Sequence, residues 1–314
     1  DENGSVANPA DSASLPATGS GSYGGSFSTG DNGYAGFDSV GNIQGTISSA
    51  TSFNFYENIG VQSQGFNPGT DAQGKTAYTK ALNLLSNQDE YDVNLILMPG
   101  ILADQHSAIV QKAIDVCEDR GDSFTIVDPV VYDSAITSVT SQGDTYDSNY
   151  AAMYWPWIQI PETQLGKNVY VPPSTVLAGI YAFNDKVAHP WFAPAGLNRG
   201  GIDVAVQAER KLTQGNRDDL YESSINPIAT FPGQGVCVWG QKTLQKKASA
   251  LDRVNVRRLL IKLKKFIAST SKFLVFEQNN SKTRNRFLNI VNPYMEQVQS
   301  NSGLNAFRVV MDDT

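Results

Sequence analysis

Val93-Asn-Leu-Ile-Leu-Met98 and Ser123-Phe-Thr-Ile-Val127 are the two short apolar runs that decide the fold. Each has the length and the aliphatic composition of a buried strand, and Pro99-Gly100 is expected to end the first one. Between them, from Asp104 to Glu118, apolar side chains recur at helical spacing. A strand, a helix and a strand in this order predict a βαβ unit, so we expect the two strands to be parallel neighbours in one sheet.

Further elements flank this unit on both sides. Apolar spacing and capping signals predict helices over 76–85, 175–187 with Ser174 as N-cap, 202–212, 249–268 and 282–299, with a kink at Pro293. Alternating or apolar runs predict strands at 51–56, 150–160, 233–240 and 307–311. We therefore expect an α/β protein with a mixed, partly parallel sheet flanked by helices on both faces, and with Tyr181 and Trp239 in its core.

Composition divides the 314 residues into three parts. Residues 1–45 contain ten Gly and eight Ser, which predicts a linker or the end of an inserted domain. Residues 46–241 are expected to form the α/β core, and residues 242–314 a basic helical part that completes it. The first residues resemble the middle of a longer protein, so we expect a fragment. No apolar run has the ~18 or more residues that a membrane span requires.

Charge is distributed unevenly along the chain. The net charge is −7, but residues 1–241 carry −16 and residues 242–290 carry +11. A chain polarised in this way favours head-to-tail association with its own copies, or docking on an acidic partner.

Most of the positive charge falls on one predicted helix. One side of it carries apolar residues that we expect to pack on the sheet: Leu259, Leu260, Leu263, Phe266 and Ile267. The opposite side carries cations that we expect to face outward: Arg253, Arg257, Lys262, Lys264 and Lys265. A solvated face, nucleic acid, an anionic membrane and an acidic protein surface all fit this pattern, and the pattern alone does not choose among them.

Gly69-x-x-x-x-Gly74-Lys75-Thr76 matches the phosphate-binding P-loop, and makes a nucleotide hydrolase the enzymatic alternative. A P-loop requires a buried strand that runs directly into the glycine turn, because its backbone N–H groups must cradle phosphate at a helix N-terminus. Here the preceding residues are polar and interrupted by Pro68, although a helix is expected to follow. Only half of the required context is present.

No other motif predicts catalysis, a cofactor or a metal site. Cys117, Cys237, His106 and His189 are far apart in sequence and lack the spacing of metal ligands. We expect them not to meet in one pocket, and we expect reduced thiols. We therefore predict a protein that is not an enzyme, with no catalytic, metal or cofactor-binding residues.

From about Tyr150 onward the sequence resembles the contractile tail sheath proteins of T-even-type myovirus phages. The resemblance rests on an ordered series of segments rather than on any single one: 151–157, 171–174, 178–181, 189–195, 225–227, 231–240, 254–258 and 276–279. Tyr154-Trp-Pro-Trp157, Gly233-Gln-Gly-Val-Cys-Val-Trp-Gly240 and Asn255-Val-Arg-Arg258 are its most specific parts. Residues 46–149 match more loosely, mainly through the βαβ pattern.

The resemblance implies a structural role. Such subunits form hexameric rings that stack helically around a tail tube, with terminal arms that add strands to a neighbour's sheet. The implied partners are other copies of the chain, the tube protein, and the baseplate and tail terminator proteins. Direct nucleic-acid contact through the basic 242–290 segment, the second alternative, and membrane insertion are not expected. The implied location is the virion, after assembly in the host cytoplasm.

Overall fold

A five-stranded sheet forms the centre of the protein, for which the computed structural model describes residues 36–37, 43–44, 73–163 and 166–311. Its strands are β3 (Leu95–Leu102), β4 (Phe124–Asp128), β5 (Ala151–Trp155), β9 (Ile225–Phe231) and β10 (Gly235–Val238), in the spatial order β10-β9-β5-β4-β3. Strands β3, β4, β5 and β9 are mutually parallel, whereas β9 and β10 form an antiparallel hairpin. The predicted parallel pairing is confirmed, with Leu97 opposite Ile126. The predicted end at Pro99 is wrong, because β3 continues to Leu102 through a register shift.

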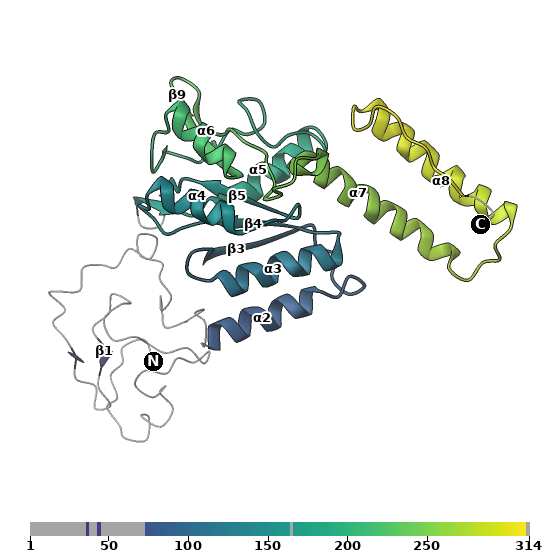
Figure 1. Cartoon of the computed structure of the whole chain (residues 1–314), viewed down its shortest axis with the longest axis horizontal. Coiled ribbons are helices and arrows are strands. Elements are labelled where there is room, and N and C mark those ends of the chain that lie inside the picture. The colour runs from purple at the N-terminus through teal and green to yellow at the C-terminus, as the bar shows by residue number, and fades with distance from the viewer. Residues whose placement is uncertain (1–35, 38–42, 45–72, 164–165, 312–314) are drawn as a thin grey trace, which may run out of the picture.

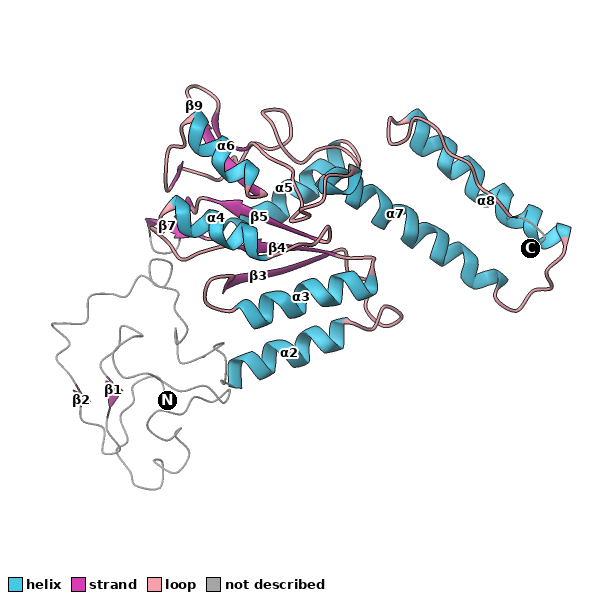
Figure 2. Ribbon diagram, viewed as in Figure 1, coloured by secondary structure: helices cyan, strands magenta, loops and turns pink. Residues whose placement is uncertain are grey.

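Helices cover both faces of this sheet (Figures 1 and 2). The α-helices of the described chain are α2 (Gln73–Leu85), α3 (Ser107–Arg120), α4 (Ile136–Thr145), α5 (Pro173–Val187), α6 (Gln214–Glu222), α7 (Val254–Ser271) and α8 (Ser281–Ser300). Alternation along β5 separates two hydrophobic cores. Met153 and Trp155 join α3, α4 and α6 on one face, and Tyr154 joins α5 and the start of α7 on the other. The predicted α/β architecture is confirmed.

A second, three-stranded sheet follows the aromatic run. The peptide bond between Trp155 and Pro156 is cis, and it separates β5 from β6 (Ile158–Glu162). Strand β6 pairs antiparallel with β7 (Lys167–Val171) and with the short β8 (Gln207–Ala208). The single strand region predicted at 150–160 is therefore divided between two sheets. A two-residue pair, β1 (Gly36–Phe37) with β2 (Ile43–Gln44), is the remaining sheet of the described residues.

Two predicted elements are absent from the described chain. Residues 202–212 form turns and β8 instead of a helix, because the backbone N–H groups of Val206 and Glu209 donate to Gln159 and Trp157. This cross-strand pairing replaces the local helical hydrogen bonds. Residues 307–311 are not a strand, since no described strand pairs with them. The strand predicted at 51–56 lies outside the described residues.

Three smaller predictions are also corrected. Trp239 is 43% exposed, because β10 ends at Val238 and the indole packs on Phe231 at the surface, whereas Tyr181 is fully buried as predicted. Ser174 does not cap α5 with its hydroxyl, which donates to Asp128 instead. Ser249 caps a short 3₁₀ turn, and α7 begins five residues later at Val254.

Candidate functional site

Helices α7 and α8 form a hairpin that projects from the α/β body (Figure 1). The start of α7 is anchored, because Val254 and Ile261 belong to the core under the sheet. The two helices touch through Phe266 and Tyr294, whose rings stack with centroids 3.7 Å apart. Beyond this contact the hairpin extends away from the sheet. It carries most of the basic segment, and is the surface on which the sequence placed the candidate contact residues.

The first two cations of α7 lie against the body. Arg257 is 7% exposed, and its guanidinium lies 4.0 Å from the ring centroid of Tyr150 and donates to Asn149 Oδ1 at 2.5 Å. Burial lowers the pKa of Arg257. Arg253 pairs with Asp252 at 3.2 Å and donates to the hydroxyl of Tyr221.

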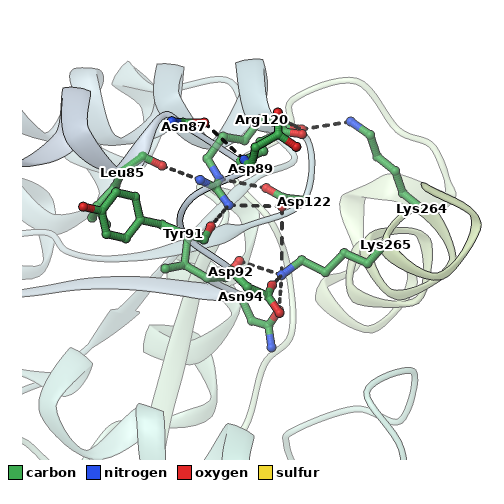
Figure 3. Close-up of polar contacts among 12 residues, drawn as sticks. Leu85, Asn87, Asp89, Tyr91, Asp92, Asn94, Arg120, Asp122, Lys264 and Lys265 are labelled. Carbon is green, nitrogen blue, oxygen red and sulfur yellow. Dashed lines mark hydrogen bonds and ion pairs between the residues drawn. The ribbon is translucent and has the colours of Figure 1, made fainter. Parts of the chain in front are cut away.

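Two lysines about two turns beyond Arg257 also bind the body (Figure 3). Lys265 Nζ donates to Asp92 Oδ1 at 2.5 Å, to the Val93 carbonyl at 2.8 Å and to Asn94 Oδ1 at 2.5 Å. The hydrogen bond and the charge of Lys265 together lower the pKa of Asp92. Lys264 Nζ donates to the carbonyl of Arg120 at 2.9 Å. The bonds of Lys265 tie α7 to the segment that leads into β3, and the bond of Lys264 ties it to the end of α3.

Arg120 holds the other side of this contact in place. Its side chain is 1% exposed and forms two hydrogen bonds with Asp122, at 2.8 and 3.1 Å. It also donates to the carbonyls of Leu85 and Tyr91. A buried guanidinium with its donors satisfied by a carboxylate and carbonyls fixes the geometry of the 85–94 turn. Arg120 and Asp122 therefore have a structural role inside the subunit.

The expectation that the five cations face outward is therefore wrong for most of them. Arg257, Lys264 and Lys265 use their charged groups within the subunit, because the Asn149 side chain, the Arg120 carbonyl and the acidic turn at 89–92 lie within their reach. The apolar side is also only partly buried: Leu259 and Leu263 are covered, whereas Leu260 and Ile267 are 39% and 36% exposed. Contact of these cations with a tube or a neighbouring subunit stays a prediction.

The sequence did not reveal the acidic residues of the body that pair with the cations of α7. Arg258 donates to both carboxylate oxygens of Asp185 at 2.8 and 2.6 Å, and it stacks over Tyr181. The run Asp89-Glu-Tyr-Asp92 was the available signal for an acidic acceptor, since it lies in a turn beside the predicted strand. The pairing of Lys265 with Asp92 was not predictable from the sequence, because the two residues are 173 positions apart.

Other polar groups are buried inside the fold. Asp128 accepts hydrogen bonds from Ser174 at the start of α5, and burial raises its pKa to about 7. His106 accepts from the Leu102 N–H, and burial lowers its pKa to about 4. Among the described residues, no three His, Cys, Asp or Glu side chains gather where a metal ion could be held. Cys117 and Cys237 are buried free thiols.

The P-loop string is only half described, since residues 69–72 lie outside the described part. Lys75 and Thr76 lie in the first turn of α2. Helix α2 lies outside α3 instead of directly on the sheet (Figure 2). A P-loop helix follows a strand of the central sheet and packs on it, so this layer does not favour nucleotide binding. In the described chain, no helix is both long and apolar enough to cross a membrane.

Comparison with known proteins identifies the family. Residues 73–244, more than half of the chain, match the phage tail sheath protein central domain. The chain belongs to the phage tail sheath family. The tail sheath protein of Vibrio phage KVP40 is 34% identical to it over 282 residues, which cover 79% of this chain and 41% of the phage protein. The tail sheath protein of Enterobacteria phage T4 is 30% identical over 255 residues, covering 75% and 39%.

A solved sheath shares the fold. The PVC sheath complex of an extracellular contractile injection system, in its contracted state, is 26% identical with a TM-score of 0.60. The match covers 73% of this sheath-family chain and 62% of that one. The chain spans about two fifths of the length of the two phage relatives.

Proposed function

We propose that this chain is a structural subunit of a contractile tail sheath, which polymerises helically around a tail tube and contracts to drive the tube through the host envelope for genome delivery. The observation that carries the proposal is the fold shared with a sheath solved in its contracted state, at 26% identity and a TM-score of 0.60. The proposed partners are other copies in stacked hexameric rings, the tube, the baseplate and the tail terminator. The proposed location is the virion, after assembly in the host cytoplasm.

Contraction of this kind requires no catalytic site. A sheath held in an extended lattice has interfaces that it has not yet made, and making them releases free energy. At ~25 cal/mol per Å² of apolar area, a few hundred additional Å² buried per subunit would contribute several kcal/mol. Repeated along a tail, this drives the movement without nucleotide. We therefore propose that the protein is not an enzyme and holds no cofactor.

Unpaired backbone supports polymerisation through strand addition. Residues 307–311 run alongside α8 (Figure 1) and have no strand partner among the described residues. Strand β3 is an edge of the central sheet. Exposed N–H and C=O groups of such segments bind an added strand from another chain.

The division of the chain at 45/46 and 241/242 also remains a proposal.

Among the five candidate cations, Lys262 is the one that donates no hydrogen bond to any described residue. We therefore assign contact with a neighbouring subunit or the tube to Lys262 first. Arg257, Lys264 and Lys265 would have to exchange an internal partner for an external one. Nucleic acid is a weaker candidate for this surface, because so few of its cations are available to bind phosphate.

Two measurements test the proposed function. Sedimentation velocity should show concentration-dependent growth of large particles, and magnesium with a labelled nucleotide should show no binding. A chain that remains monomeric at all concentrations, or that binds nucleotide through Lys75 so that Lys75→Ala abolishes the signal, would refute the proposal.

A further inference from the structure

The loop at the end of the hairpin presents apolar side chains to solvent. Phe273, Val275 and Phe276 are 78%, 65% and 100% exposed. The carboxylate of Glu277 follows Phe276 directly and is exposed as well. A run of exposed apolar residues on a projecting loop is typical of a contact site. We call residues 273–277 the tip.

A groove of about 430 Å³ lies where α7 meets the body. Phe124 and Ile261 line it, and the stacked rings of Phe266 and Tyr294 contribute to its wall. This volume falls within the range of specific ligand sites, and its lining combines aromatic surface with charged groups. The groove is therefore suited to an aromatic side chain that carries a carboxylate beside it.

Lys262 is the charged group of the groove that lacks a bonded partner. Two other cations in the lining are engaged: Arg258 pairs with Asp185, and Lys265 pairs with Asp92. Lys262 is exposed and makes no hydrogen bond or salt bridge with a described residue. Lys262 helps to lower the pKa of nearby Asp92, but that carboxylate is bonded to Lys265. The ammonium donors of Lys262 remain available to an incoming anion, and a carboxylate gains most from such a site when apolar contacts around it exclude water.

The tip of a chain cannot fill the groove of the same chain. Lys262 and Ser271 lie nine residues apart on the single helix α7, which separates them by roughly 14 Å at 1.5 Å per residue. The tip begins beyond the end of that helix. The tip therefore reaches a groove of this kind in a second copy.

We propose that the tip of one copy occupies the groove of a second copy, with Phe276 against Phe266 and Tyr294, and with Glu277 paired to Lys262. The inference rests on the proposed function, because it names a contact by which the chains polymerise. Each copy offers one tip and one groove, so the contact is heterologous and can extend into an open chain. Charge complementarity between Glu277 and Lys262 fixes the direction of the contact.

Charge reversal tests this pairing. Lys262→Glu and Glu277→Lys should each weaken self-association at least tenfold in sedimentation velocity, and the double variant should restore it. Phe276→Ala should weaken it by a similar factor, since buried aromatic residues dominate interface affinity. Lys247→Glu, which changes an exposed lysine elsewhere by the same charge, should associate as the unmodified chain does.

Cysteine cross-linking tests the geometry independently of charge. Both native thiols are buried, and Ser269 of the groove and Val275 of the tip lie beside the proposed pairs without belonging to them, so an equal mixture of Ser269→Cys and Val275→Cys chains should form a disulfide-linked pair under mild oxidation. Failure of this pair to form, or failure of the double charge reversal to restore association, overturns the inference. If the chain polymerises and all variants polymerise equally, only the inference fails. If the unmodified chain never associates, the proposed function fails with it.

Discussion

The carboxylate of Asp128 accepts two hydrogen bonds from Ser174, one from the backbone N–H at 2.9 Å and one from the hydroxyl at 2.6 Å. The contact joins the end of β4 to the first turn of α5, and Asp128 is 1% exposed. The helix N-terminus favours the charged carboxylate, but burial favours the neutral form, and the raised pKa shows that burial dominates.

Stability should therefore depend on pH through Asp128. Its folded pKa of about 7 lies above the ordinary value of 3.8, so its contribution is present below pH 3.8 and is lost as the pH rises through 7. His106 acts in the opposite direction: its contribution is present above pH 6.5 and is lost as the pH falls through 4. Asp128→Asn keeps the acceptor but removes the titration.

Urea unfolding at several pH values measures this difference. Between pH 5 and 7, the unfolding free energy of Asp128→Asn should rise relative to the unmodified chain by about 1 kcal/mol per pH unit. A difference that stays constant over this interval would mean that Asp128 does not titrate there.

Arg120 should be far more important for stability than an exposed arginine. Arg120→Met leaves Asp122 without its main partner and two carbonyls without a donor, so we expect a loss of about 3–5 kcal/mol in unfolding free energy. Arg210→Met removes an ion pair whose side chains are 38% and 79% exposed, and should cost below about 1 kcal/mol. Similar losses in the two variants, measured by denaturant titration, would contradict this assignment.

Lys265 should hold α7 against the body. Lys265→Ala removes three hydrogen bonds, so amide hydrogen exchange in residues 91–95 and 262–271 should accelerate roughly tenfold, which corresponds to about 1.4 kcal/mol. Lys262→Ala is the matched control on the same helix, and exchange in the dilute, unassociated chain should be unchanged. Equal acceleration by both variants would show that these bonds do not hold the helix.

Two helical glycines should respond oppositely to alanine. A Cβ on Gly143 of α4 would lie 2.2 Å from the Ser223 carbonyl, so Gly143→Ala should destabilise by about 2 kcal/mol or more. A Cβ on Gly179 of α5 would meet nothing within 4 Å, so Gly179→Ala should stabilise by up to about 1 kcal/mol through helix propensity. Thermal unfolding of the two variants distinguishes these signs, and a shift in the same direction would contradict the packing described at Gly143.

The fold could be predicted where local pattern and tertiary context agree. Residues 93–127 are apolar in both strands because both faces of the sheet are covered, and this pattern was sufficient to predict parallel pairing. Residues 202–212 have helical spacing as well, but pairing with β6 replaces the local hydrogen bonds. Hydrogen bonding between segments that are distant in sequence cannot be predicted from the local pattern of a single sequence.

The candidate site was predicted in composition but not in geometry. The positive charge of α7 was evident, whereas its acceptors Asp92, Arg120 and Asn149 come from three other regions of the chain. Charge spacing on one helix identifies which side chains share a face, but it contains no information about what that face meets. The exposed tip was likewise hidden, since Phe273 and Phe276 have the composition of a core segment.

Electron cryomicroscopy of the assembled protein tests most directly the claim that this chain is a sheath subunit. The account predicts hollow tubes with helical striation, built from stacked rings of six copies, in which the α/β body fits the repeating density. It further predicts a shorter and wider form that buries more surface between subunits than the longer form. Closed oligomers that never stack, or filaments of one fixed length per ring with no second form, would contradict it.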